Sequence, residues 1–260
     1  MIQPICEREL PFIVKVPRVA SIGQGTFIVC METDRSAIIT LFREEVQSML
    51  LTLKPSNASL HPCNLIVQDM VPGETVGLTF FVTQSGKEIF NCCTKQKVDD
   101  AYCWSGGFVS YQEQPALEQH YRKTLNTVAK FLHAKGYFGP AGVDVMTDAN
   151  GTQLIVDLNV RITGTYHLGP LRGHFTRRGL FEAAALANQR FLCTLNQFQC
   201  MFTEELKDGS LLVTAWTHVK QFSFATITVA GHDIQSLHAL IGRIASCAAL
   251  WNGEDTNGDA

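Results

Sequence analysis

The sequence lacks the features that mark several classes of protein. Its 260 residues contain no apolar run close to the ~18 residues that a membrane-spanning helix requires. The N-terminal residues do not follow the basic-then-apolar pattern of a signal peptide. Lys and Arg number 21 against 24 Asp and Glu, and the formal net charge is −3. Because nucleic-acid coats and polybasic membrane binders need a basic excess, we expect neither a nucleic acid nor a membrane as partner.

Cysteines with metal-binding spacing are also missing. None of the nine cysteines belongs to a Cys-x-x-Cys motif, and the adjacent Cys92 and Cys93 are too close for ordinary disulfide geometry. Buried free thiols in a reducing compartment fit this pattern, which predicts a soluble, cytoplasmic protein. The composition, 46% apolar and 17% charged with only 9 Pro, is that of a folded chain of one large or two modest domains.

Hydrophobic periodicity predicts helices that alternate with hairpins, which favours an α+β fold over a doubly wound parallel sheet. Helices are predicted over 35–53, 115–135, 179–190 and 237–248. Strands are predicted over 12–16, 26–30, 65–67, 76–83, 88–93, 108–111, 142–147, 153–161, 211–217 and 224–229. The polar, Gly-containing stretch 95–107 is predicted to be a loop.

The most informative segment is the predicted hairpin over 142–161. Asn150-Gly151 is a strong signal for a two-residue turn, because both turn positions need positive φ. Counting outward from this turn pairs Asp144 with Asp157 on one face of the sheet. Directly opposed like charges destabilise a hairpin, so this pair calls for a cation.

Side-chain alternation places Asn159 and Arg161 on the same face, with Val156, Leu158 and Val160 towards a core. Two carboxylates and an amide oxygen suit Mg²⁺ or Mn²⁺. Because Mg²⁺ completes its shell with water and phosphate oxygens, such a site implies a nucleotide. The alternative is an exposed hairpin with solvated carboxylates, and a one-residue slip would turn one of them to the other face.

Other candidates carry weaker signals. Lys15 lies in an apolar strand, where an unpaired charge is costly, and Gly23-Gln24-Gly25 after it is either a phosphate loop or a plain turn. The sequence contains neither a P-loop nor a Rossmann fingerprint. Four basic residues form a cluster that either holds an anion or is a solvated surface: Arg172, His174, Arg177 and Arg178.

The strand lysine, the glycine loop, a Pro-Gly-Glu hinge and the final hairpin GVDVMTDANGTQLIVDLNVRITGT occur in the order of the ATP-grasp superfamily, which the chain resembles over about 10–188. The resemblance implies an ATP-grasp fold with a small α/β lid and a larger antiparallel-sheet subdomain with helices. It implies a lid and hinge over 1–74 and a catalytic subdomain with the metal hairpin over 75–190. The hydrophobic pattern predicts a C-terminal α/β extension of the same domain over 191–251, and the small polar residues predict a flexible tail over 252–260.

The resemblance also implies roles for single residues. Lys15 would contact the α- and β-phosphates of ATP, and Arg161 would stabilise the transferring phosphoryl group. The loop closing over the phosphates would contain Ser21, Gly23 and Gly25. The adenine amino group would face Gln68 or Asp69, the ring edge would meet the backbone of Met70 and Val71, and the ribose would bind Glu74. The Mg²⁺ ligands would be Asp144, Asp157 and Asn159, although Asp157 is shorter than the usual Glu.

The activity implied by the resemblance is an ATP- and Mg²⁺-dependent ligase. It would activate a small carboxylate as an acyl phosphate and join it to an amine or similar nucleophile. A phosphotransferase with the same ATP grip is an alternative. Family members begin with a further N-terminal domain, and this chain starts about ten residues before the lid strand. A nucleotide-binding subunit or pseudoenzyme that needs a partner chain is therefore the second hypothesis.

Overall fold

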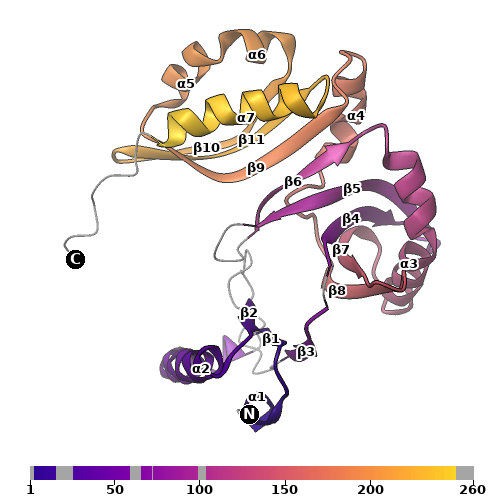
Figure 1. Cartoon of the computed structure of the whole chain (residues 1–260), viewed down its shortest axis with the longest axis vertical. Helices are drawn as coiled ribbons and strands as arrows, with labels where there is room; N and C mark the ends of the chain where they lie inside the picture. The colour runs from indigo at the N-terminus through magenta and orange to yellow at the C-terminus, as the bar shows by residue number, and fades with distance from the viewer. Residues whose placement is uncertain (1–2, 16–25, 59–65, 72, 99–103, 250–260) are drawn as a thin grey trace. The chain divides into compact units, whose positions relative to one another are not determined.

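The computed structural model describes residues 3–15, 26–58, 66–71, 73–98 and 104–249. The chain forms two compact units (Figure 1): unit 1 contains Met1–Pro72 and Asp99–Trp104, and unit 2 contains Gly73–Val98 and Ser105–Ala260. The segment 191–249 therefore belongs to the same unit as the hairpin predicted over 142–161. Within the described ranges, no helix combines the length and the apolar character needed to cross a membrane.

Unit 1 is a small antiparallel sheet with helices on one face. The strand order is β2-β1-β3. The strands are β1 (Phe12–Lys15), β2 (Thr26–Val29) and β3 (Ile66–Asp69), and the helices are α1 (Gln3–Glu7) and α2 (Glu32–Thr52). The core face carries Phe12, Val14 and Val29, which pack with Ile5 of α1 and Ile38 of α2. This alternation fixes which strand side chains face away from the helices.

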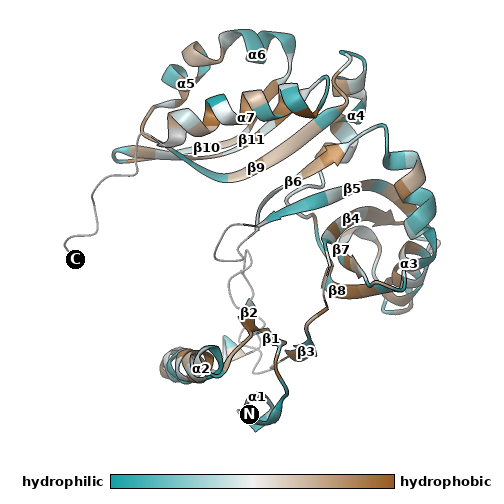
Figure 2. Ribbon diagram, in the orientation of Figure 1, coloured by the Kyte–Doolittle hydropathy of each residue, from teal (hydrophilic) through white to brown (hydrophobic). Residues whose placement is uncertain are grey.

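Unit 2 is built on an eight-stranded sheet of order β10-β11-β9-β6-β5-β4-β7-β8. Its strands are β4 (Thr75–Val82), β5 (Glu88–Val98), β6 (Trp104–Ser110), β7 (Gly139–Thr147), β8 (Gln153–Asn159), β9 (Glu182–Phe191), β10 (Leu211–Val219) and β11 (Phe222–Gly231). Its helices are α3 (Gln114–Ala134), α4 (Leu168–Thr176), α5 (Leu195–Met201), α6 (Thr203–Asp208) and α7 (Ile234–Ala249). In Figure 2, β4 and β8 are largely brown, whereas β5 is largely teal.

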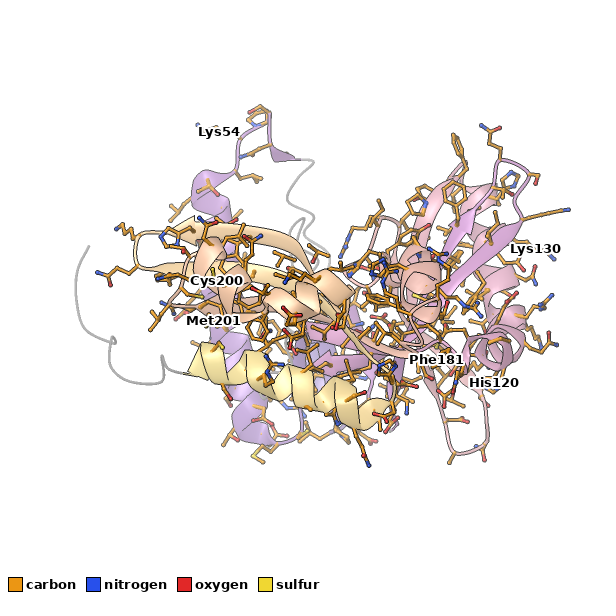
Figure 3. All side chains as sticks on the ribbon, turned by 90° about the horizontal axis from the view of Figure 1, so that it is seen from above. Lys54, His120, Lys130, Phe181, Cys200 and Met201 are labelled. Atoms are coloured by element: carbon orange, nitrogen blue, oxygen red, sulfur yellow. The ribbon has the colours of Figure 1, made fainter. Side chains whose placement is uncertain are left out.

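Helices cover one face of this sheet at both ends. The apolar stripe of α3, which includes Leu125 and Val128, packs against β4 and β7, as predicted. Leu237 and Ile244 of α7 pack against β9 and β11 in a second cluster with α5. Figure 3 labels His120 and Lys130 on α3 and, at the other end of the sheet, Cys200 and Met201 on α5.

The opposite face, called the site face below, is defined by one row of residues across the strands. The row is Asp157, Asp144, Gly77, Thr94, Gly107, Ala185 and Thr228. At its far end this face is apolar, because α4 packs Leu168 and Phe175 onto Ala183 and Ala185 of β9. At the β7–β8 end its row carries polar side chains.

Two predictions about secondary structure are wrong. Residues 179–190 are not a helix, because most of them form β9. Alanine favours a helix locally, but Ala183, Ala184 and Ala185 are at most 1% exposed and lie between helices on both faces of the sheet. Successive side chains of a strand point to opposite faces of a sheet, so consecutive alanines that are buried on both faces fit a central strand. The stretch 95–107 is likewise no loop, since its described residues continue β5 and β6.

The β7–β8 hairpin pairs Asp144 with Asp157 as predicted, although its turn differs. Of the two turn residues only Gly151 has positive φ (80°), and Asp148 N–H donates to Thr152 O at 3.0 Å. The turn therefore has three loop residues, which shifts the register near the tip by one. A bulge at Val156 shifts it back before the carboxylates are reached.

Candidate functional site

The site begins with the two opposed carboxylates of the hairpin. Asp144 on β7 is half-buried, and its cross-strand partner Asp157 on β8 is exposed. Gly142 and Asn159 form the next pair on the same face. Side chains directly opposed in an antiparallel pair have Cβ atoms about 4.5–5.5 Å apart, so two negative charges lie close together on the site face.

Hydrogen bonds join the rest of the predicted row. Asn159 Nδ2 donates to Asp157 Oδ2 at 2.9 Å, and Arg161 Nη2 donates to Asn159 Oδ1 at 3.1 Å. Asn159 therefore links a carboxylate to a guanidinium. The prediction for the apolar neighbours is correct for Leu158, which packs on the α3 core, and wrong for Val160, which is 44% exposed. Val160 lies beyond the end of β8, where strand alternation no longer fixes its direction.

Sequence reasoning missed Gln96, which orients one of the carboxylates. Its Nε2 donates to Asp144 Oδ1 at 2.7 Å. The side chain reaches across β4 at Gly77, where a Cβ would lie 2.8 Å from that nitrogen. A glycine at this place in the row is the one sequence signal that points to the contact. By holding one carboxylate oxygen, the amide fixes the orientation of the Asp144 side chain.

The residues present fit a magnesium ion. Among the described residues no three His, Cys, Asp or Glu side chains are grouped for metal binding, so only two carboxylates and an amide are at hand. Mg²⁺ needs few protein ligands, because water and phosphate oxygens complete its octahedron. The donors are all oxygens, and the opposed charges favour a divalent cation. The assignment of Asp144, Asp157 and Asn159 as metal ligands stays a prediction.

A strap, residues 160–167, follows the hairpin and crosses the site face. Thr163 lies over Gly142 of β7, and Thr165 lies over Gly107 of β6, where added Cβ atoms would meet the threonine methyl groups at 2.5 and 2.9 Å. His167 Nε2 hydrogen-bonds Thr228 Oγ1 of β11 at 2.7 Å. The strap thus rests on the sheet from the β7–β8 hairpin to the start of α4.

Side chains of β5 and of Tyr111, the residue after β6, donate hydrogen bonds to the backbone of the strap and of α4. Asn91 Nδ2 donates to Tyr166 O at 2.7 Å, Cys92 Sγ donates to Thr165 O at 3.8 Å and Tyr111 OH donates to Leu168 O at 2.9 Å. Burial raises the pKa of Cys92 to about 11 and that of Cys93 to about 12. Both thiols are protonated at neutral pH, so neither is a nucleophile.

Unit 1 carries the remaining predicted residues that the structure describes. Lys15 and Gln68 lie on the face of the small sheet that turns away from its core. Asp69 lies on the other face, and its carboxylate accepts a hydrogen bond from Arg8 Nη2. Met70 is 38% exposed. Val71, the residue after it, is half-buried.

The predicted phosphate loop and the predicted ribose ligand remain to be placed. The loop residues Ser21, Gly23 and Gly25 lie outside the described residues. Glu74 is exposed and belongs to unit 2, where it directly precedes β4.

The basic cluster is partly structural. His174 Nε2 hydrogen-bonds Gly209 O at 3.0 Å, and Arg178 Nη1 donates to His174 O at 2.8 Å. Gly209 has φ of +78°, and a Cβ there would lie 2.9 Å from His174 Nε2. His174 therefore holds the turn after α6, and Arg178 holds the carbonyl of His174, so these contacts account for both residues without an anion.

Comparison with known proteins agrees with this fold. A family model described as ATP-grasp domain matches residues 11–165. The chain is similar to N5-carboxyaminoimidazole ribonucleotide synthetase from Thermus thermophilus, with TM-score 0.57 and 14% identity over 97% of this chain and 66% of that chain. The ADP complex of the Staphylococcus aureus N5-carboxyaminoimidazole synthetase gives 0.57 and 13% over 93% and 63%. A biotin carboxylase complex from Campylobacter jejuni gives 0.57 and 10% over 95% and 59%.

At identities of 10–14%, the similarity to these solved structures shows the fold alone. The chain spans less than two thirds of the length of each of these solved structures. A comparison with curated protein sequences gives no match.

Proposed function

The chain belongs to the ATP-grasp family, whose model covers residues 11–165 of 260, and from this we propose that it is an ATP- and Mg²⁺-dependent ligase. It would activate a small carboxylate as an acyl phosphate and join it to an amine or similar nucleophile. The observation that carries the proposal is the opposed pair Asp144 and Asp157, extended by Asn159 and Arg161 on one face.

The metal hairpin supplies the phosphate chemistry in this proposal. Asp144, Asp157 and Asn159 would hold Mg²⁺, which when bound supplies positive charge to the phosphate oxygens. Arg161 would stabilise the charge of the transferring phosphoryl group. Phosphoryl transfer depends mainly on positioning and on electrostatic stabilisation, so these groups suffice without a protein nucleophile.

Unit 1 and the segment after it would bind the rest of the nucleotide. Lys15 would contact the α- and β-phosphates. Between the two candidates for the adenine amino group we favour Gln68, because it shares a face with Lys15, whereas Asp69 is paired with Arg8. The backbone of Met70 and Val71 would meet the ring edge, Glu74 would take the ribose hydroxyls, and the closing loop would contain Ser21, Gly23 and Gly25.

Calorimetric titration with Mg-ATP tests the site. The variant with Asp144→Asn and Asp157→Asn should lose the Mg²⁺-dependent part of ATP binding, because both anionic ligands become neutral amides of the same shape. The variant Asp148→Asn is the matched control. Asp148 is on the same hairpin, but its carboxylate accepts hydrogen bonds from the backbone N–H groups of Asn150 and Thr152 and is not a proposed metal ligand. Unchanged Mg-ATP affinity in the double variant would mean that the metal assignment is wrong.

An ADP-release screen of carboxylate and amine pairs tests the activity. We expect ADP release that requires both substrates. Turnover that appears only after addition of a lysate fraction would identify the chain as a nucleotide-binding subunit of a larger enzyme. A stable phosphorylated product without a second nucleophile would identify a phosphotransferase. The described free cysteines, among them Cys6, Cys30 and Cys200, support a proposed location in the cytoplasm.

A further inference from the structure

The short loop that carries Arg161 closes on Gly142 at both of its ends. At one end Asn159 is the cross-strand partner of Gly142. At the other end Thr163 returns over the same glycine, and its methyl carbon would lie 2.5 Å from a Cβ at that position. Within the loop, Arg161 Nη2 donates to Asn159 Oδ1 and Nη1 donates to Ile162 O, both at 3.1 Å.

From this geometry we propose that Gly142 and Thr163 are positioning residues, and that the contact between them sets the place of Arg161 relative to the metal ligands. The inference rests on the proposed function, because Arg161 and Asn159 matter to catalysis only if the hairpin binds Mg-ATP. It assigns a role to two residues that contact neither the metal nor the nucleotide in that proposal.

The residues that follow Thr163 are held on the sheet, so the contact between Gly142 and Thr163 controls the position of the loop that carries Arg161. Thr165 sits over Gly107, Asn91 Nδ2 holds Tyr166 O, and His167 is bonded to Thr228. The strap therefore resists displacement on its α4 side. A side chain added at Gly142 would therefore displace Thr163 together with the loop over 159–163, which joins β8 to the strap. Arg161, the exposed residue at the middle of this loop, moves with it.

The distances also predict how the contact can be rebuilt. An alanine at 142 would meet the Thr163 methyl at 2.5 Å, a separation that real Cβ atoms do not show. The next atoms, Thr163 Cβ and Leu78 O, lie at 3.6 Å, which is ordinary van der Waals contact. Thr163→Ser removes the one atom that clashes. The double variant with Gly142→Ala and Thr163→Ser adds a methyl group at 142 and removes one at 163, so the total side-chain volume at the contact is conserved.

The test measures ATP affinity by calorimetry, with Mg²⁺ and with EDTA, together with the melting temperature of each variant. Gly142→Ala should weaken Mg-ATP binding by about tenfold, because its cross-strand partner is the proposed metal ligand Asn159, and groups that position a metal ligand are worth about 10–100-fold in affinity. Thr163→Ser should weaken it by about threefold, since it leaves the contact underfilled. The double variant should return to within about twofold of the natural chain. Binding in EDTA should change little in all of them.

Gly242→Ala is the matched control, because a Cβ at Gly242 of α7 meets no atom within 4 Å. A double variant as weak as Gly142→Ala, or equal losses with and without Mg²⁺, would overturn the positioning role. If Gly142→Ala does not fold, Thr163→Ser must still bind Mg-ATP more weakly than the double variant does. Absence of Mg-ATP binding by the natural chain would instead refute the proposed function, so the two failures are distinguishable.

Discussion

The two ends of the site face of unit 2 are used in opposite ways. At the β6–β9–β11 end, Ala183 and Ala185 are covered by α4 through Leu168 and Phe175, all at most 1% exposed. At the β7–β8 end the same face carries Asp144 and Asp157, and the polar groups there bond to one another. One end contributes stability through burial, and the other keeps charges accessible for a ligand.

This difference shows how a single sheet separates stability from binding. Burial of apolar side chains is worth several kcal/mol per residue in a well-packed cluster. Exposed polar pairs contribute little to folding, so they can be arranged for a ligand. Changes at the α4 end should therefore act on stability, and changes at the hairpin end should act on binding.

The largest effect is expected at the covered end. Phe175→Ala should lower the free energy of unfolding by about 3–5 kcal/mol, because it opens a cavity in a fully buried cluster. The matched change Ile89→Ala, at a residue that is 57% exposed, should cost less than about 1 kcal/mol. Urea unfolding followed by circular dichroism measures both. Similar losses in the two variants would mean that burial beneath α4 does not stabilise the fold.

A binding effect is expected from Gln96 at the polar end. Gln96→Leu should weaken Mg-ATP affinity by about tenfold, since partners that orient a metal ligand are worth about 10–100-fold in affinity. The melting temperature should hardly change. Gln199→Leu, at an exposed residue of α5, is the control. Calorimetry that gives equal affinities for the two variants would remove Gln96 from the site.

A smaller effect of opposite sign is expected for the carboxylates in the absence of metal. Asp144→Asn combined with Asp157→Asn should raise the free energy of unfolding by about 0.5 kcal/mol, because it removes a like-charge repulsion across the hairpin. The gain should shrink in high salt, which screens the repulsion. Urea unfolding at low and high salt measures it, and a loss of stability in the double variant would contradict a net repulsion between the two carboxylates.

The smallest effect concerns His167 of the strap. Burial lowers its pKa below the ordinary value of 6.5, and a hydrogen bond to the Gly164 backbone opposes that shift. The unfolded chain binds the proton more readily, so stability is lost as the pH falls below about 6.5 and is constant above it. His167→Gln should reduce this slope, measured as unfolding free energy against pH. An unchanged slope would mean that His167 does not contribute to it.

Sequence reasoning found the carboxylate pair partly through two errors that cancel. It assumed a two-residue turn at Asn150-Gly151, whereas the turn has three loop residues and the bulge at Val156 restores the register. Turn length and bulge both depend on tertiary packing, which local propensity does not encode. Alternation along β8 correctly placed Asn159 on the site face, because its neighbour Leu158 packs into the core on the opposite face.

Other parts of the fold were out of reach of the sequence. The strand β9 consists of residues that favour a helix, and only burial on both faces makes it a strand. Gln96 reaches Asp144 across an intervening strand, so no spacing along the chain reveals the contact. The same holds for Asn91, which bonds a carbonyl 75 residues away. In each case the partners meet through sheet order, which is a global property.

The bulge at Val156 also separates the tip of the hairpin from the carboxylates. Register between β7 and β8 is set independently on its two sides, at Val145–Ile155 and at Asp144–Asp157. The exposed tip at Asn150 is thus an attachment point, where an inserted residue or a fluorescent label adds little closure entropy. A probe placed there can report on hairpin motion in the intact protein while Asp144 and Asp157 remain opposite each other.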